Sequence, residues 1–239
     1  MVKIVLDTAQ DVAAQVAKIY VKQLKDKPDS VLGLATGSTP VALYGQLVKK
    51  YQAGEIDFSK ARSFNLDEYY PMKADHPQSY HYFMKEHLFD KVNFASSSIP
   101  SGEAKDPKAE CKRYDKEIED AGGIDVMLLG IGHNGHVGFN EPAVTYSMGT
   151  GFVDLSDSSI SANKRYFSAD EVQPTKAITM GIGDIFRSRK IILIITGENK
   201  AKIAKKLFEN QIHTDVPACF LLLHPDVTVY LDKDAASLI

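Results

Sequence analysis

The stretch IDVMLLGIGHNGHVGFNEP, residues 124–142, combines a short apolar segment with a loop rich in polar groups. Its first six residues are apolar except for Asp125 and are typical of a buried strand. The following segment, Gly130–Pro142, contains four glycines, two histidines, two asparagines and one glutamate. Functional side chains are often carried by loops that a rigid element positions, so this loop is a candidate site.

Short apolar or β-branched segments recur along the chain, separated by stretches of helical periodicity. Besides residues 124–131 they are KIVL (3–6), VLGLA (31–35), RSFNL (62–66), KAITMGI (176–182), KIILIIT (190–196) and VTVYL (227–231). Strands that alternate with helix-length segments indicate a parallel sheet covered by helices. We therefore predict an α/β fold, with an open, mostly parallel sheet and helices on both faces, in a single domain over residues 1–239. The first helix is expected to begin at Thr8, which with Asp11 has the spacing of a capping box.

The overall composition indicates a globular protein. The 239 residues carry a formal net charge of -3, which gives no electrostatic reason to bind nucleic acid or an anionic membrane. No segment approaches the ~20 apolar residues of a membrane span, and the N-terminus lacks the apolar core of a signal peptide. Cys111 and Cys219 show no repeated metal-ligand spacing. A soluble, cytoplasmic protein with reduced thiols is expected.

Four of the predicted strands end in polar sequence. The clusters are Thr36–Pro40, Asp67–Tyr69, the loop that begins at Gly130, and Thr196–Lys200. In an open α/β sheet the ligand-binding crevice lies beyond the carboxyl ends of the strands. We therefore expect the four clusters to converge on one pocket.

The segment Thr36–Pro40, TGSTP, has the features of an anion-binding helix start. Its glycine allows a tight turn, the serine and second threonine supply hydroxyl groups, and the proline suits the first position of a helix. Free amide donors and the positive end of the helix dipole would then face a phosphate. Lys200 and Arg165 are candidates to complete the anion site. The alternatives are a capped helix start without a ligand, and two solvated basic residues.

Asp67 and Glu68 are adjacent carboxylates at the end of a predicted strand. Neighbouring side chains of an extended chain point in different directions, so at most one of the two is expected to face the pocket. A carboxylate with restricted solvation can abstract a proton from carbon, because burial raises its pKa and its basicity. The alternative is a turn or helix cap.

His133, His136 and Glu141 lie in the glycine-rich loop. The glycines argue against the regular helix on which zinc proteases place their histidines, so no metal is expected here. A histidine oriented by a carboxylate is a general acid or base poised near neutral pH. The glycines also let the backbone approach a small polar substrate closely.

The region from Tyr146 to Asp170 is rich in serine, aspartate and glycine and poor in long apolar runs. We predict a mobile lid around residues 146–175, with a plain surface excursion as the alternative.

Three motifs together resemble the glucosamine-6-phosphate deaminase family. They are FNLDEYY (64–70), LGIGHNGHVGFNEP (129–142) and LATGSTP (34–40). FNLDEY and GHVGFNEP are specific to that family, whereas TGSTP is shared more widely among sugar-phosphate proteins. The resemblance covers nearly the whole chain. It implies an enzyme, a hydrolase or isomerase acting on an amino sugar phosphate, that converts glucosamine 6-phosphate and water to fructose 6-phosphate and ammonia.

The resemblance also assigns roles to individual residues. Asp67 would move the proton between C2 and C1 of the opened sugar, through an enolamine intermediate. His136 would protonate the ring oxygen for ring opening, and Glu141 would orient the imidazole. The residues implied for phosphate binding are Thr36, Gly37, Ser38, Thr39, Arg165 and Lys200. No metal or organic cofactor is implied, because the amine on C2 and the carbonyl on C1 provide the chemistry.

The chain departs from the family pattern in two ways. Many members have aspartate where this chain has Asn134, so His136 is expected to depend more heavily on Glu141, with Asn134 in a supporting role. Members activated by N-acetylglucosamine 6-phosphate carry basic residues shortly after the NEP motif, whereas Tyr146–Leu155 has no lysine or arginine. The given sequence also ends in LDKDAASLI, without the longer tail of hexameric members. An unregulated monomer or small homo-oligomer is expected.

Two other functions compete with this interpretation. 6-Phosphogluconolactonase resembles the family in fold and in a glycine-histidine loop, but that loop continues toward a Ser-Leu-Phe-Pro type of sequence, whereas this chain has VGFNEP. A sugar-phosphate-sensing domain of a transcription regulator would need the phosphate loop but not Asp67, His136 and Glu141 together. It would usually be joined to a basic DNA-binding segment.

Overall fold

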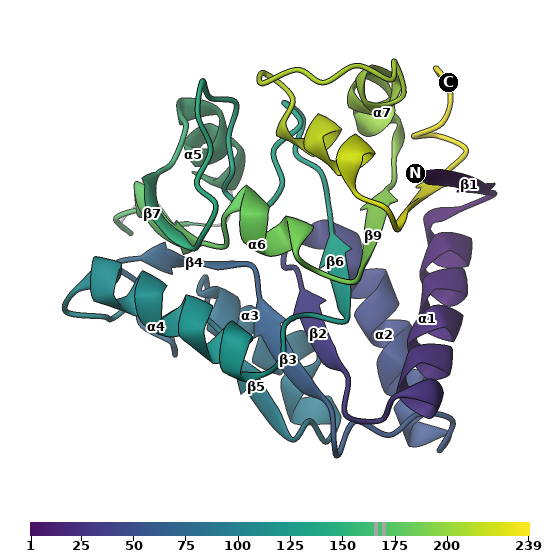
Figure 1. Ribbon diagram of the computed structural model, residues 1–239, viewed down its shortest axis with the longest axis horizontal. Helices are drawn as coiled ribbons and strands as arrows, with labels where there is room; N and C mark the ends of the chain where they lie inside the picture. Colours follow the sequence, from purple (N-terminus) through teal and green to yellow (C-terminus); the bar gives the residue numbers. More distant parts are fainter. Residues whose placement is uncertain (165–166, 169–170) are drawn as a thin grey trace.

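The computed structural model describes residues 1–164, 167–168 and 171–239. Its main sheet has seven strands, all parallel to their neighbours (Figure 1). In spatial order they are β1 (Val2–Leu6), β10 (Val227–Asp232), β9 (Lys190–Ile195), β6 (Val126–Leu129), β2 (Val31–Leu34), β3 (Arg62–Asn65) and β5 (Ser96–Ser98). The prediction of an α/β fold with a mostly parallel sheet is confirmed. Residues 124–129 contribute β6, which lies in the middle of the sheet and is buried throughout.

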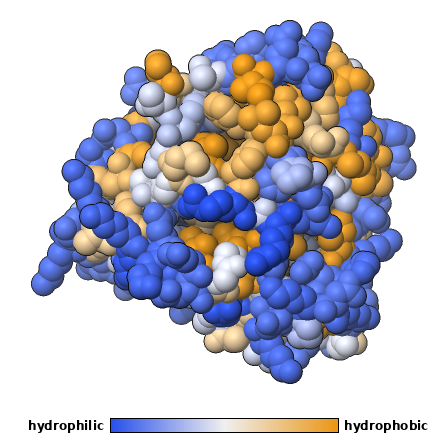
Figure 2. Space-filling model, in the orientation of Figure 1, coloured by the Kyte–Doolittle hydropathy of each residue, from blue (hydrophilic) through white to orange (hydrophobic). Residues whose placement is uncertain are grey.

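Helices cover both faces of this sheet (Figure 1). On one face, buried apolar residues pack the sheet against α1 (Ala9–Asp26), α2 (Ser38–Gln52) and α3 (Tyr80–His87). The 3₁₀ helix η1 (Phe89–Lys91) packs against the same cluster through Phe89. A second buried cluster joins the sheet to α4 (Pro107–Asp120), α6 (Ile182–Phe186), α7 (Ala201–Leu207) and the 3₁₀ helix η4 (Pro217–Leu223). The outer side of α4 is hydrophilic, and Figure 2 shows hydrophilic residues over that part of the face.

The helix α1 starts where the sequence predicts, whereas α2 starts at a different residue from the predicted one. Thr8 caps α1 and forms the expected capping box with Asp11. The helix α2 begins at Ser38, two residues before the expected position, so that Gly37 is its N-cap and Pro40 its third residue. Proline is tolerated there because the amides of the first turn have no partner within the helix.

A second sheet has three antiparallel strands, in the order β4 (Asp67–Tyr70), β8 (Lys176–Thr179) and β7 (Gly151–Asp154). The placement of residues 176–182 in the parallel sheet was therefore wrong. A buried strand has the same apolar pattern in either kind of sheet, so the pattern does not say which neighbour it pairs with. The chain passes from β3 through Leu66 directly into β4, which places Asp67 where the two sheets meet.

The four polar clusters follow β9, β6, β2 and β3, which are four consecutive strands in the spatial order of the sheet. Because parallel strands all end at the same edge, the clusters are brought side by side there.

Within the described part of the chain, no helix is long and apolar enough to cross a membrane.

Candidate active site

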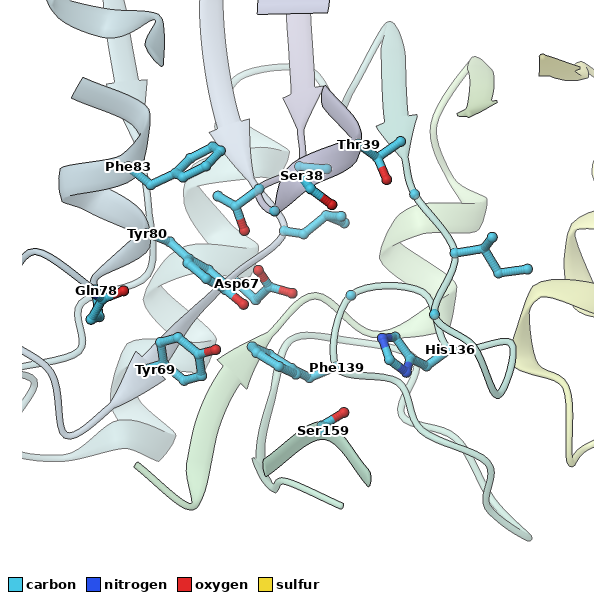
Figure 3. Close-up of a pocket in the computed structure, with 18 of the residues that line it drawn as sticks. Ser38, Thr39, Asp67, Tyr69, Gln78, Tyr80, Phe83, His136, Phe139 and Ser159 are labelled. Atoms are coloured by element: carbon cyan, nitrogen blue, oxygen red, sulfur yellow. The ribbon is translucent and has the colours of Figure 1, made fainter. Parts of the chain in front are cut away.

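A pocket of about 500 Å³ lies at this edge of the sheet (Figure 3). Each of the four polar clusters contributes to its lining, through Thr36–Thr39, Asp67, Gly130–His133 with His136, and Asn199 with Lys200. The predicted convergence of the clusters is confirmed. Asp67 and His136, which the chain separates by almost seventy positions, line the same cavity.

The N-terminus of α2 forms one wall of the pocket. Gly37, its N-cap, has a φ of 88°, which favours glycine, and no side chain caps the helix. The amides and hydroxyls of Ser38 and Thr39 are therefore available to an anion, and the helix dipole favours negative charge at this end. Four of the residues predicted to bind the phosphate, Thr36, Gly37, Ser38 and Thr39, therefore lie together at this wall.

Lys200 reaches the pocket from the end of the 3₁₀ helix η3 (Glu198–Lys200). Its Nζ donates to the carbonyl oxygen of Ile131 at 2.8 Å. Burial lowers the pKa of this ammonium group to about 8, and an anion placed beside it would stabilise the charged form. The second basic residue predicted for the phosphate, Arg165, lies outside the described residues.

Asp67 lies in the pocket wall and is 5% exposed. Burial, and to a lesser degree the neighbouring charge of Glu68, raise the pKa of Asp67 well above its ordinary value. The group is therefore held back from ionising, and its ionised form is a strong base because little water is present to stabilise the charge.

Glu68 points away from the pocket, as expected for one of two adjacent carboxylates. Its oxygens accept the backbone N–H groups of Tyr69, Tyr80 and His81, each at 2.9 Å, and thereby bind the first turn of α3. Burial raises the pKa of Glu68 to about 7, although these three hydrogen bonds act to lower it. The helix-cap alternative therefore applies to Glu68 and not to Asp67.

His136 is held by two acceptors on one side of its ring. Its Nδ1 lies 2.7 Å from Asn134 Oδ1 and 3.3 Å from Glu141 Oε2, so Nδ1 carries a proton and Nε2 is left to exchange protons. Asn134 also donates from Nδ2 to Glu141 Oε2 at 2.8 Å. The asparagine thus links the imidazole to the carboxylate without contributing charge, and the negative charge beside His136 comes from Glu141.

Glu141 is well prepared to stabilise a protonated imidazole. Burial acts to raise its pKa, but hydrogen bonding to His136 and the charge of that residue, with further hydrogen bonds from Ser159 and Asn134, lower the pKa to about 2. Glu141 therefore stays ionised throughout the neutral range. Neither Glu141 nor Asn134 lines the cavity itself, since both lie behind the ring of His136.

Two glycines of the loop allow this arrangement. A β-carbon at Gly132 would lie only 2.2–2.4 Å from three ring atoms of His136, so any other residue would displace the imidazole. Gly138 has a φ of 57°, and a β-carbon there would lie 3.3 Å from Asp67 Oδ2. The histidine loop therefore passes directly beside Asp67.

Several residues of the pocket were not predicted as site residues, although Tyr69 and Phe139 lie within the motifs quoted above. Tyr69, Tyr80 and Phe139 form an aromatic wall around Asp67, with ring centroids 4.8 Å apart for Tyr69 and Tyr80 and 5.9 Å apart for Tyr80 and Phe139 (Figure 3). The predicted lid region provides Ser159, from α5 (Asp157–Asn163), and Phe167. Within the described residues, no three His, Cys, Asp or Glu side chains lie together as metal ligands.

Several proteins of similar sequence, and one of similar solved structure, are glucosamine-6-phosphate deaminases. A family model described as glucosamine-6-phosphate isomerases/6-phosphogluconolactonase matches residues 6–230. A glucosamine-6-phosphate deaminase of Thermoanaerobacter pseudethanolicus is 51% identical over 232 residues, which cover 96% of this chain and 92% of that protein. The solved structure of a monomeric glucosamine-6-phosphate deaminase matches with a TM-score of 0.96 and 42% identity, and all of both chains is covered.

The other branch of the family is more distant. A solved 6-phosphogluconolactonase of Thermotoga maritima matches with a TM-score of 0.76 but only 20% identity, over 97% of this chain and 98% of that one. At that identity the match shows a shared fold alone.

Proposed function

The chain belongs to the family of glucosamine-6-phosphate isomerases and 6-phosphogluconolactonases, and we propose that its pocket carries out the deaminase reaction with Asp67 and His136 as the catalytic residues. The protein is an enzyme that isomerises and deaminates glucosamine 6-phosphate, giving fructose 6-phosphate and ammonia. The observation that carries the assignment of the residues is the placement of a buried carboxylate and a carboxylate-backed imidazole in one cavity beside an open helix N-terminus.

The helix N-terminus binds the phosphate and thereby orients the sugar. The phosphate oxygens accept from the amides and hydroxyls of Ser38 and Thr39, with Lys200 beside them. The other end of the sugar then extends toward Asp67 and the histidine loop. His136 Nε2 takes the proton from the anomeric hydroxyl and passes it to the ring oxygen as the C1–O5 bond breaks, which opens the ring and frees the aldehyde at C1. Glu141 stabilises the imidazolium between these proton transfers.

Asp67 carries out the isomerisation. Its carboxylate removes the proton from C2, and the electrons form the C1–C2 double bond of an enolamine as O1 takes up a proton from solvent. The same carboxyl group then delivers its proton to C1. The product is an iminium ion at C2, which water hydrolyses to the ketone and ammonia, with return of a proton to solvent. Asp67 must be ionised to accept the first proton, and the aromatic wall that keeps water away makes its carboxylate basic enough to do so.

The sequence-based alternatives have less support. An activated water would suffice for lactone hydrolysis, whereas Asp67 and the aromatic wall provide a dedicated carbon base. The expected description of the enzyme as a hydrolase is not supported, because the sequence relatives are named deaminases and their branch of the family is that of the glucosamine-6-phosphate isomerases. Isomerisation with deamination is the appropriate description.

The working unit that we propose is a single chain without allosteric activation. It is supported by the absence of lysine and arginine in Tyr146–Leu155 and by the monomeric relative.

The segment 146–175 is proposed to close over the bound sugar, since Ser159 and Phe167 reach the pocket from it. We place the reaction in the cytoplasm, where a phosphorylated sugar is retained and where the buried free thiols of Cys111 and Cys219 stay reduced.

Release of ammonia tests the proposed function. The purified protein is mixed with glucosamine 6-phosphate, and ammonia and fructose 6-phosphate are measured with coupled assays. We expect equal amounts of both products and no hydrolysis of 6-phosphogluconolactone. Lactone hydrolysis without ammonia would identify the second branch of the family, and phosphate-sugar binding without either reaction would indicate a sensor.

A further inference from the structure

The two carboxylate oxygens of Glu141 are held by different parts of the chain. Oε2 accepts from Asn134 Nδ2 at 2.8 Å and lies 3.3 Å from His136 Nδ1, within the same loop. Oε1 accepts the hydroxyl of Ser159, eighteen positions further along and on α5. Ser159 is 4% exposed and lines the pocket beside Phe139 and His136 (Figure 3).

This second anchor decides how the carboxylate is oriented. The terminal torsion of a glutamate is broad and has no strong preference of its own, so the plane of the group is set by its hydrogen bonds. With Oε2 alone held, the carboxylate could turn about that point and lose its alignment with the imidazole. The hydroxyl of Ser159 holds the opposite oxygen and prevents the turn.

The position of Ser159 depends on the docking of α5. Ser156 caps the helix and accepts the backbone N–H of Ser159 at 3.1 Å, while Gln173 donates to the carbonyl oxygen of Ile160 at 2.7 Å. Ile160 packs against the cluster that contains Tyr69 and Phe139. The helix therefore rests on the aromatic wall of the pocket, and its serine reaches Glu141 from there.

We propose that Ser159 is a positioning residue that couples α5 to the His136–Glu141 pair, so that the acid for ring opening is fully assembled only when α5 lies over the pocket. The proposal rests on the proposed function, because it concerns the same histidine. It assigns to this segment a task beyond covering the substrate. The hydroxyl group of Ser159 thus links the position of α5 to the alignment of Glu141 with His136.

Three variants separate the hydroxyl from the packing of the helix. Ser159→Ala removes the donor, Ser159→Thr keeps it, and Ser161→Ala makes the same change at an exposed position of α5. We expect Ser159→Ala to lower kcat for ammonia release about 10-fold with KM changed less than about 2-fold, because one hydrogen bond to a charged group is lost and no phosphate contact changes. Ser159→Thr should recover kcat to within about 3-fold, and Ser161→Ala should match the unmodified enzyme.

A second measurement does not depend on activity. The carboxyl carbon of Glu141 is followed by NMR against pH in the ligand-free protein and assigned with Glu141→Gln. We expect its protonation midpoint to rise by about one pH unit in Ser159→Ala and to stay low in the other two Ser variants. If the protein released no ammonia at all, the proposed function would fail, but this titration would still decide whether Ser159 holds Glu141.

The results that would overturn the proposal are distinct. An unchanged kcat in Ser159→Ala would show that the hydroxyl is not needed. Equal losses in Ser159→Ala and Ser159→Thr would assign the effect to packing, as would a matching fall in the thermal midpoint. An unmoved Glu141 titration would show that Ser159 does not act on that carboxylate.

Discussion

Asp67 and Glu68 are adjacent in β4, yet their carboxylates have different surroundings. Asp67 faces the cavity, and Glu68 binds the amides at the start of α3. The alternation of an extended chain explains the difference, because consecutive side chains leave the strand on opposite sides. The same alternation places the carboxyl group of Glu68 directly behind the proposed base.

Replacement of Asp67 tests its role as the carbon base. Asp67→Asn keeps the shape of the side chain but cannot accept the C2 proton. We expect exchange of the C2 hydrogen with solvent, followed by proton NMR in D₂O, to fall at least about 100-fold, while binding of inorganic phosphate changes little. Exchange at the unmodified rate would remove Asp67 from this role.

The charge of Glu68 should be visible in the pH profile. Burial is the main cause of the raised pKa of Asp67, and the charge of Glu68 adds to it. A base with a raised pKa is protonated and inactive below that pKa, so activity is lost as the pH falls through it. Glu68→Gln removes the charge, and the acid limb of kcat/KM should therefore move to lower pH. A limb that stays in place or moves upward would contradict this account.

The glycine-rich loop shows how one element positions several groups. Gly132 leaves room for the imidazole of His136, and Gly138 passes beside Asp67. The loop is fixed from outside as well, since Asn140 donates from Nδ2 to the carbonyl oxygens of Val137 and Met180, both at 2.9 Å. The loop after β6 thus positions His136, proposed for ring opening, and also lies beside Asp67, proposed for isomerisation.

A single methyl group at Gly132 should impair this element. Because the added β-carbon would lie within 2.4 Å of the His136 ring, we expect Gly132→Ala to lower kcat about 100-fold and to leave the fold intact. Gly45→Ala is the matched control, since a β-carbon there meets no atom within 4 Å among the described residues. Kinetics and circular dichroism of both variants make the test. Equal activity of the two variants would mean that the imidazole tolerates displacement.

Local sequence predicted the glycine-rich loop and the capping box of α1 better than it predicted contacts between residues far apart in the chain. Thr8 and Asp11 are three positions apart, and their hydrogen bonds follow from that spacing alone. Ser159 lies among other serines and aspartates without a periodic pattern, and its partner Glu141 belongs to another element. No rule of spacing links such residues, so this contact required the structure.

At the scale of the whole molecule, the apolar segments predicted the parallel sheet and the edge at which the polar clusters meet. They did not predict the antiparallel sheet of β4, β8 and β7. β8 has the apolar pattern of a buried strand in either sheet, and β7 has only four residues. The direction in which a strand pairs depends on contacts far apart in the chain, which hydrophobic periodicity does not record.

The proposed single-chain enzyme makes a prediction for assembly and regulation. Light scattering after gel filtration should give the mass of one chain, and the velocity should depend hyperbolically on glucosamine 6-phosphate. Added N-acetylglucosamine 6-phosphate should not change the shape of the curve, because Tyr146–Leu155 has no basic residue to bind its phosphate. A sigmoidal curve that this compound alters would reveal an allosteric site elsewhere.

The most direct measurement is a crystal structure with the open-chain alcohol of glucosamine 6-phosphate bound. We predict one ligand molecule with its phosphate at the N-terminus of α2, its C1 and C2 within about 3.5 Å of Asp67, and its O5 hydroxyl beside His136 Nε2. A ligand that contacts His136 but leaves C2 out of reach of Asp67, or that binds in another hollow, would contradict the account.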